Sequence, residues 1–256
     1  MLNDAQIAEY HDKGYVVPDF RLPEDQLEEI RGRHTALLKR HPEFRDNASV
    51  LLSYDLSFLN YAREPAILDM VEQLIGPDIC LWNMSFFAKP ALNGKKTPWH
   101  QDGQYWPIRP LASCSVWIAI DDVGVENGCM RVIPGSHRNE GLLRHHLNTS
   151  DDLTLNQELD EDQFDEEDAV DIVLKPGQMS FHDINLVHGS RHNRSRNRRA
   201  GFVLRYMPTT SHFDRELGQK FEQGSSVVNF SERALYLARG VDQCGLNDFE
   251  IGHLSS

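Results

Sequence analysis

Two separate segments of the chain carry residues that could together hold a metal ion. His100 and Asp102 lie in the first segment, and His188 follows 88 positions after His100. Two imidazoles and one carboxylate can occupy one face of an octahedral Fe(II) ion, which leaves three positions open for a chelating cosubstrate and O2. Side chains two residues apart project from the same face of a β-strand, so the His-x-Asp spacing suits this geometry.

The His-x-Asp spacing is weak by itself, because a chain with 12 histidines can contain it by chance. A second copy occurs at His212 and Asp214, where His253 is the only later histidine and no arginine opens an apolar strand downstream. We interpret this copy as a loop or helix-entry pair. Six histidines in polar or helical surroundings are predicted to be surface residues: His11, His34, His41, His145, His146 and His253.

An arginine eleven residues after His188 distinguishes the first copy from the second. Arg199 opens the apolar segment 199–206, which is predicted to be a core strand. A buried guanidinium needs an anionic partner, because an unpaired buried charge is costly. A dicarboxylate cosubstrate held by a bidentate pair would supply that partner, and an internal ion pair with an Asp or Glu is the alternative.

Ordered motifs accompany these residues between positions 86 and 208. They are FAKP (87–90), WHQDGQYWP (99–107), WIAIDD (117–122), ENGCMRVIPGSH (126–137), PGQMS (176–180) and HGSRHNRS (188–195) followed by Arg199. With these motifs the chain resembles the phytanoyl-CoA dioxygenase family of Fe(II)/2-oxoglutarate oxygenases, and in particular its bacterial small-molecule hydroxylases. The resemblance implies a double-stranded β-helix, that is, a jelly-roll or cupin-like barrel.

The resemblance also implies the reaction. His100, Asp102 and His188 would bind Fe(II) as the catalytic centre, which would use 2-oxoglutarate and O2 to hydroxylate a substrate and release succinate and CO2. In such enzymes the cofactor carries the difficult chemistry, and the protein orients and shields it. The family's halogenases carry Gly or Ala at the place of Asp102, so the carboxylate here indicates hydroxylation.

Four residues are candidates for binding 2-oxoglutarate. By the resemblance, Arg199 anchors the distal carboxylate and Ser190 adds a hydroxyl to the same group. Trp117 looks like a wall of the cosubstrate pocket, and a core aromatic is its alternative role. Asn83 shares the strand parity of Lys89, so it is a candidate donor to the C1 carboxylate or to the substrate, with a cross-strand hydrogen bond as the alternative.

Lys89, Gln104, Tyr105 and Arg205 are candidates for contacting the substrate. Arg205 has the strand parity of Arg199, so it is a second inward cation that either binds an anionic substrate or stabilises the barrel rim. We favour a small polar or anionic metabolite, such as an amino acid or an aminoalkylphosphonate. The alternatives are an acyl-CoA hydroxylase of the same mechanism, a non-catalytic jelly-roll binding protein, and a cupin-like metalloenzyme that uses no 2-oxoglutarate.

Helical patterns precede strand-like segments along the chain. Helices are predicted at 23–39 and 64–74, where acids lie in the first turn of the first helix and Gly76-Pro77 ends the second. Seven segments rich in branched and aromatic residues follow between turn signals: 79–89, 97–105, 113–123, 129–133, 170–174, 178–183 and 199–207. This order predicts one mainly β domain with flanking helices. Its expected parts are N-terminal helices (1–77), a jelly-roll core (78–210) with an acidic insert (151–174), and a C-terminal extension (211–256).

The formal net charge of −13 is concentrated in the acidic insert. Residues 151–174 contain eleven acids and no Lys or Arg, so the rest of the chain is close to neutral. We interpret this segment either as a solvated loop or as a lid beside the active-site mouth that would repel anionic substrates. The overall acidity argues against a nucleic-acid partner held through backbone phosphates.

The apolar runs, the N-terminus and the cysteines of the sequence predict where in the cell the protein is located. No apolar run approaches 18 residues, so no membrane span is predicted. The N-terminus has no basic n-region and no apolar h-region, so no secretory signal is predicted either. The four cysteines show no CxxC or zinc-finger spacing and are predicted to be buried free thiols, which favours a cytoplasmic protein.

Overall fold

The computed structural model describes residues 1–139, 141–222 and 230–253. Its helices are α1 (Asp4–Lys13), α2 (Glu24–Arg40), α3 (Leu59–Ala62), α4 (Pro65–Ile75) and α5 (Arg215–Glu222). Its strands are β1 (Tyr15–Val16), β2 (Asn47–Ala48), β3 (Ile79–Lys89), β4 (Thr97–His100), β5 (Ile108–Arg109), β6 (Cys114–Ala119), β7 (Met130–Val132), β8 (His145–Leu147), β9 (Gln157–Leu159), β10 (Val170–Ile172), β11 (Met179–Asp183), β12 (His188–Ser190), β13 (Arg199–Pro208), β14 (His212–Phe213) and β15 (Tyr236–Arg239).

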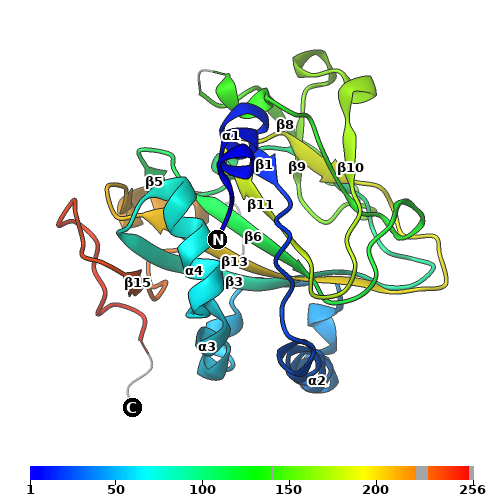
Figure 1. The fold of residues 1–256 in the computed structure, drawn as a ribbon. Helices are drawn as coiled ribbons and strands as arrows, with labels where there is room; N and C mark the ends of the chain where they lie inside the picture. Colours follow the sequence, from blue (N-terminus) through cyan, green and yellow to red (C-terminus); the bar gives the residue numbers. More distant parts are fainter. Residues whose placement is uncertain (140, 223–229, 254–256) are drawn as a thin grey trace.

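Two antiparallel sheets form the body of the fold (Figure 1). The larger sheet has the order β1-β11-β6-β13-β3-β15, with β2 also paired to β3, and the smaller sheet has the order β10-β7-β12-β4. Every neighbouring pair in both sheets is antiparallel. Side chains from both sheets line one cavity, so the sheets face each other in a jelly roll. This confirms the predicted fold class.

The larger sheet has one face toward the cavity and one toward the main hydrophobic core. On β3, Met84, Phe86 and Ala88 belong to that core, whereas Asn83 and Ser85 line the cavity. Successive side chains of a strand point to opposite faces, so the alternation of apolar and polar residues in the sequence fixes which residues face the cavity.

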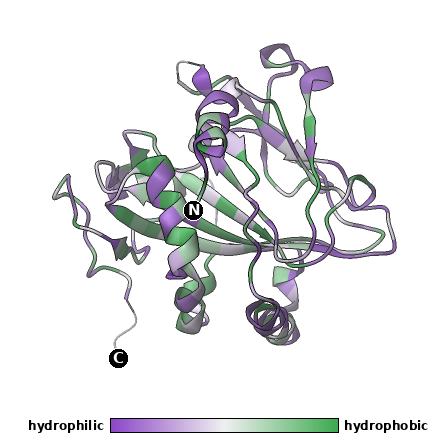
Figure 2. Cartoon of the chain, in the orientation of Figure 1, coloured by the Kyte–Doolittle hydropathy of each residue, from purple (hydrophilic) through white to green (hydrophobic). Residues whose placement is uncertain are grey.

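Helices cover the outer face of the larger sheet (Figure 1). Ile67 and Val71 of α4 and Leu27 and Ile30 of α2 are buried in the same core as the outer residues of the strands. Figure 2 shows hydrophobic residues along the strands and hydrophilic residues along much of α2. Burial of this apolar surface stabilises the arrangement by about 25 cal/mol per Å².

Local signals set the helix ends. Asn3 and Gln6 form a reciprocal capping box at the start of α1, which ends at Gly14 with a φ of 82°. Pro65 begins α4, and Gly76, with a φ of 92°, follows its last residue. The predicted helices at 23–39 and 64–74 therefore agree with α2 and α4 to within one residue at each end.

One histidine predicted at the surface lies in the core. His34 on α2 is fully buried, and its ring stacks on Phe86 with the centroids 4.1 Å apart. Burial lowers the pKa of His34 to about 4, so the ring is neutral at pH 7. The prediction was wrong because His34 shares the buried helix face of Leu27, Ile30 and Leu37, a spacing that outweighs its polar neighbours.

Each of the seven predicted strand segments contains an observed strand. The segment 97–105 is extended only as far as His100, because Asp102–Gln104 form a 3-10 turn. Short strands from outside the predicted core also join the larger sheet, namely β1 and β2 from the N-terminal part and β15 from the C-terminal part. Of the predicted extension 211–256, residues 223–229 and 254–256 lie outside the described residues.

The acidic segment 151–174 is folded onto the barrel, where it contributes β9 and β10. Many of its acids form ion pairs with basic residues elsewhere: Glu158 with Lys96, Glu166 and Asp171 with Arg131, Asp160 and Asp162 with Arg144, and Asp152 with His192. These pairs are mostly half-exposed, so each stabilises the fold by little. Lys96, Arg131 and Arg144 thereby offset part of the charge that the sequence concentrates here.

Two further features bear on the environment of the protein. No helix in the described part of the chain is long and apolar enough to cross a membrane. All four cysteines are free thiols, as predicted. Cys80, Cys114 and Cys129 are buried, whereas Cys244 is half-buried, so the prediction of burial was wrong for Cys244.

Candidate metal and cosubstrate site

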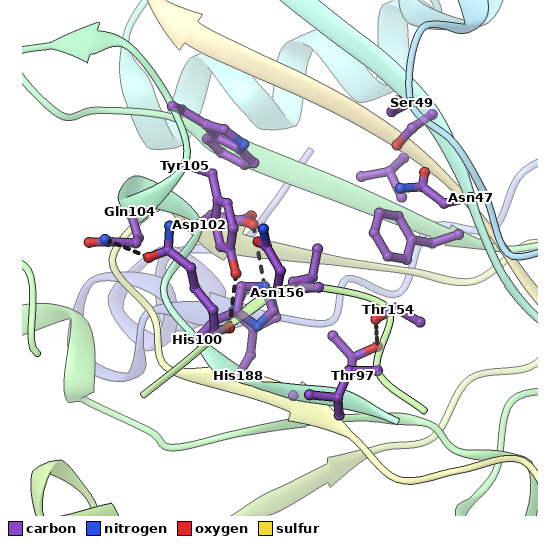
Figure 3. A pocket seen from close by; sticks show the side chains of 18 of the residues that line it. Asn47, Ser49, Thr97, His100, Asp102, Gln104, Tyr105, Thr154, Asn156 and His188 are labelled. Carbon is purple, nitrogen blue, oxygen red and sulfur yellow. Dashed lines mark hydrogen bonds and ion pairs between the residues drawn. The ribbon is translucent and has the colours of Figure 1, made fainter. Parts of the chain in front are cut away.

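His100, Asp102 and His188 meet on the cavity side of the smaller sheet (Figure 3). His188 on β12 is the antiparallel partner of His100 on β4, so strand pairing joins two segments that are far apart in sequence. One potential ligand atom from each residue lies within 4.8 Å of the others, and all three side chains are buried. The centroids of the two imidazole rings are 4.2 Å apart.

Backbone carbonyls fix the orientation of both imidazoles. Nδ1 of His100 lies 2.8 Å from the carbonyl oxygen of Pro98, and Nδ1 of His188 lies 2.9 Å from that of Leu186. Each Nδ1 therefore donates a proton to a carbonyl, and each Nε2 keeps a lone pair for a metal. Burial, and then the neighbouring His100, lower the pKa of His188 to about 3, so this ring is in its neutral, metal-binding form at pH 7.

Asp102 is ionised although it is buried. Burial raises its pKa, but contacts with His100 and His182 outweigh burial and hold that pKa well below the usual range. Oδ1 of Asp102 lies 3.6 Å from Nε2 of His100, and Oδ2 lies 3.7 Å from Nε2 of His182. Two imidazoles and one carboxylate, with room beside them in a cavity, are the donor set of non-haem Fe(II) oxygenases. The residues present therefore fit an iron(II) ion.

Arg199 lies in the same cavity at the start of β13. Its Nε and Nη2 donate to the carbonyl oxygen of Gly128 at 3.0 and 2.7 Å, and Nη2 lies 3.5 Å from Oγ of Ser190. The guanidinium carbon lies 5.3 Å from the ring centroid of Trp117. Burial lowers the pKa of Arg199 to about 10, so the group stays charged at pH 7. Among the described residues no acid forms an ion pair with it, which removes the internal ion pair as its explanation.

The cavity has a volume of about 710 Å³ and contains nearly all the residues that the sequence singled out. Besides the three metal-ligand candidates, it is lined by Asn83, Gln104, Tyr105, Trp117, Ser190, Arg199 and Arg205. Figure 3 shows Gln104 and Tyr105 beside His100 and Asp102, with Asn47 across the cavity.

Lys89 does not line the cavity, although the sequence placed it toward the substrate. Its side chain is buried, and Nζ donates to the carbonyl oxygen of Lys95 and to Oγ1 of Thr97. Lys89 lies on the same face of β3 as Asn83, so the parity argument was sound. The strand simply continues past the end of the cavity before it reaches Lys89.

One wall of the cavity was missed. Residues 148–150 and 153–157, which precede and open the acidic segment, line the cavity with apolar and neutral polar side chains. The Gln104 side chain donates to Oε1 of Gln157 at 2.8 Å, and the Tyr105 hydroxyl donates to the Gln157 carbonyl at 3.0 Å. Asn, Thr and Gln are ordinary loop residues, so the length of the excursion was the only available signal.

The jelly roll and this donor set are those expected of a non-haem Fe(II) oxygenase. A family model described as phytanoyl-CoA dioxygenase matches residues 10–201, and the chain belongs to that family.

Two curated relatives illustrate the membership. The human peroxisomal phytanoyl-CoA dioxygenase is 32% identical over 166 residues, which cover 62% of this chain and 48% of the human protein. The chain therefore spans about half the length of that relative. A probable phytanoyl-CoA dioxygenase from Caenorhabditis elegans is 25% identical over 237 residues, which cover 80% of this chain and 75% of the relative.

Solved structures share the fold. The non-heme monooxygenase ThoJ in its apo form matches with a TM-score of 0.72 and 26% identity, over 95% of this chain and 87% of ThoJ. EvdO2 from Micromonospora carbonacea var. aurantiaca, complexed with 2-oxoglutarate, matches with a TM-score of 0.69 over 81% of this chain and 91% of EvdO2. The identity to EvdO2 is 23%, so this likeness concerns the fold alone.

Proposed function

We propose that this protein is an Fe(II)/2-oxoglutarate-dependent dioxygenase that hydroxylates an unactivated C–H bond of a small polar or anionic metabolite and releases succinate and CO2. One observation carries the proposal. His100, Asp102 and His188 converge in a cavity that also holds Arg199, a buried cation without an acidic partner among the described residues. The triad offers ligands for the metal, and Arg199 offers a cation for a dicarboxylate.

The three proposed metal ligands are preorganised by their contacts within the chain. Bound Fe(II) would supply a redox-active centre at which O2 and 2-oxoglutarate are activated for attack on a C–H bond. His100 and His188 present Nε2 toward one point, because backbone carbonyls hold their Nδ1 protons. Asp102 supplies the ionised oxygen, and the burial of all three side chains limits the access of bulk water.

Arg199 is the proposed anchor of 2-oxoglutarate. Its hydrogen bonds to Gly128 use Nε and Nη2, which fixes the guanidinium plane and leaves Nη1 for a carboxylate. Ser190 can join the same carboxylate from β12, and Trp117 packs beneath the guanidinium as a wall of the pocket. Asn83 faces the cavity from β3 and is a candidate donor to the cosubstrate or the substrate.

The substrate is proposed to be small and polar or anionic, such as an amino acid or an aminoalkylphosphonate. Gln104, Tyr105 and Arg205 line the part of the cavity that it would occupy. The second candidate is an acyl-CoA, because the human relative that is 32% identical is named for phytanoyl-CoA. The carboxylate of Asp102, where a halogenase of this family would have Gly or Ala, favours hydroxylation.

Succinate release tests the proposal. We expect Fe(II), O2 and 2-oxoglutarate to yield succinate in the presence of at least one compound from a panel of small acids, amines, phosphonates and acyl-CoA thioesters. His188→Ala, purified in parallel, should yield none. If the wild-type protein consumes no 2-oxoglutarate with any member of the panel, the proposed function is wrong.

We further propose the cytoplasm as the compartment. All four cysteines are free thiols, which suits a reducing environment. The human relative is described as peroxisomal, so cell fractionation decides between the two.

A further inference from the structure

Two arginines lie on the cavity face of β13, and they are too far apart for one molecule of 2-oxoglutarate to contact both. Arg199 and Arg205 lie six residues apart on this strand, and both line the cavity. At the rise of a β-strand this separation is about 20 Å. The five-carbon chain of 2-oxoglutarate is much shorter, so a molecule anchored on Arg199 leaves Arg205 for another ligand.

Arg205 is a buried cation without an acidic partner of its own. Its Nη1 lies 2.6 Å from Oγ of Ser85, and its Nε has no hydrogen-bond partner. The residue is 8% exposed, and no acid among the described residues forms an ion pair with it. Asp102, the acid whose charge acts on it, is already engaged with two imidazoles. A cation held in this way is costly unless an anion arrives to pair with it.

The charged residues around the cavity make it positive although the whole chain is acidic. In the described lining, the two arginines of β13, Arg199 and Arg205, stand against the single carboxylate of Asp102. Fe(II) and doubly ionised 2-oxoglutarate carry opposite charges of equal size, so their binding leaves this excess in place. None of the eleven acids of 151–174 lines the cavity, so the segment does not repel an anion from within it.

Beside Arg205 the cavity is walled by aromatic rings. The guanidinium carbon of Arg205 lies 5.2 Å from the ring centroid of Trp106, which in turn packs edge-on against Trp82 at 4.5 Å. Phe221 and Phe230 complete this part of the lining. We call these four residues the aromatic cluster. Such a surface suits a flat apolar body, since aromatic side chains pack in offset or edge-to-face arrangements.

We propose that Arg205 and the aromatic cluster bind a substrate that combines one anionic group with a flat apolar or aromatic body. The anionic group would pair with the free edge of the Arg205 guanidinium, which Ser85 orients as a positioning residue. The body would lie against Trp106, which Trp82 supports from behind. This inference rests on the proposed function and narrows its substrate class to aromatic or similarly flat acids.

Matched acids and amides test the inference directly. The probes are 3-phenylpropionate with 3-phenylpropionamide, and indole-3-acetate with indole-3-acetamide. Each is titrated calorimetrically into the anaerobic protein loaded with Fe(II) and 2-oxoglutarate. We expect at least one acid to bind about 10- to 100-fold more tightly than its amide, the range that a charge-assisted hydrogen bond supports. Arg205→Gln should remove this preference by weakening the acid and not the amide, and Arg205→Lys should keep part of it.

Two controls separate the possible failures. Arg138→Gln removes an exposed arginine outside the cavity and should leave the preference intact. The affinity of Arg205→Gln for 2-oxoglutarate should stay within about twofold of wild type, since a change of that size is a small fraction of one hydrogen bond. Normal binding of 2-oxoglutarate also shows that the Arg205→Gln variant is folded.

The inference is overturned if a protein that binds 2-oxoglutarate normally shows no acid preference, or binds neither pair. It is also overturned if Arg205→Gln mainly weakens 2-oxoglutarate, because Arg205 would then belong to the cosubstrate site. Failure of the wild-type protein to bind 2-oxoglutarate in the presence of Fe(II) would instead refute the proposed function, and this inference with it.

Discussion

Gly201 is a position where one methyl group tests the proposed cosubstrate pocket. A Cβ atom built on Gly201 would lie 2.0 Å from Cζ2 and 2.1 Å from Cε2 of Trp117. Real Cβ atoms do not approach other atoms this closely, so the indole must move in Gly201→Ala. Trp117 lines the cavity and packs against the Arg199 guanidinium, and any movement therefore changes the place proposed for 2-oxoglutarate.

The expected size of the effect follows from these contacts. Overpacking a filled site costs about 1–3 kcal/mol. Loss of the contact between Arg199 and the indole adds about 0.5–2 kcal/mol. The first cost lowers the stability of the fold, and the second bears on the cosubstrate site. Since about 1.4 kcal/mol corresponds to a tenfold change in affinity, we expect Gly201→Ala to weaken 2-oxoglutarate binding by about 2- to 30-fold. Its free energy of unfolding should fall by about 1–3 kcal/mol.

The assay is an anaerobic titration of the Fe(II)-loaded protein with 2-oxoglutarate, together with a denaturant titration. Gly32→Ala on α2 is the matched control, because a Cβ there meets nothing within 4 Å. It should bind 2-oxoglutarate normally and gain about 0.5–1 kcal/mol of helix stability. Trp117→Phe removes the atoms that clash, so the double variant with Gly201→Ala should bind better than Gly201→Ala alone.

The reasoning is refuted if Gly201→Ala binds 2-oxoglutarate like the wild-type protein, because Trp117 then does not border the cosubstrate. Equal losses in Gly201→Ala and Gly32→Ala would likewise contradict it, since only the first substitution creates a clash.

Two further predictions concern stability. Ni(II) at about 100 times its Kd should raise the melting temperature by about 5–10 °C, because it binds the folded state alone. His188→Ala should show no such shift in a thermal melt. An equal shift in both proteins would contradict the proposed metal site. Burial holds the pKa of His34 at about 4 in the folded state against 6.5 as its ordinary value, so the unfolded state binds more protons below pH 7 and stability falls as the pH falls. Between pH 7 and pH 5 this group should account for about 2 kcal/mol of lost stability, which denaturant titrations of His34→Gln should no longer show; the same pH dependence in both proteins would contradict the buried, neutral ring.

Strand periodicity and residue chemistry predict a mainly β domain, and the family resemblance was needed to predict the jelly roll and the convergence of the triad. The apolar runs that became β3 and β13 were long and regular, and the turn signals between segments were plain. His100 and His188 could be assigned to strands, and antiparallel pairing of those strands then brought them together. The family resemblance joined these separate signals into one barrel.

The sequence could not show where the cavity ends along a strand. Lys89 and Asn83 share a face of β3, yet only Asn83 reaches the cavity. The alternation of side chains along a strand determines which face of the sheet a residue occupies. It does not determine whether that residue reaches the cavity, because this depends on which loops close the two ends of the barrel. The same limit concealed the neutral wall at 148–157, whose residues carry no periodic or chemical signal.

His34 was missed for a different reason. Its polar neighbours on the helix indicate a surface position, but the apolar spacing that it shares with Ile30 and Leu37 places it on the buried helix face.

The central claim is that one cavity holds Fe(II) on the triad and 2-oxoglutarate on Arg199. Its most direct test is the weak visible charge-transfer absorption that an Fe(II)/2-oxoglutarate chelate produces in the absence of O2. We expect this band in the wild-type protein and no band in His188→Ala. In Arg199→Ala the band should need a much higher 2-oxoglutarate concentration. No band in the wild-type protein, or an unchanged titration in Arg199→Ala, would contradict it.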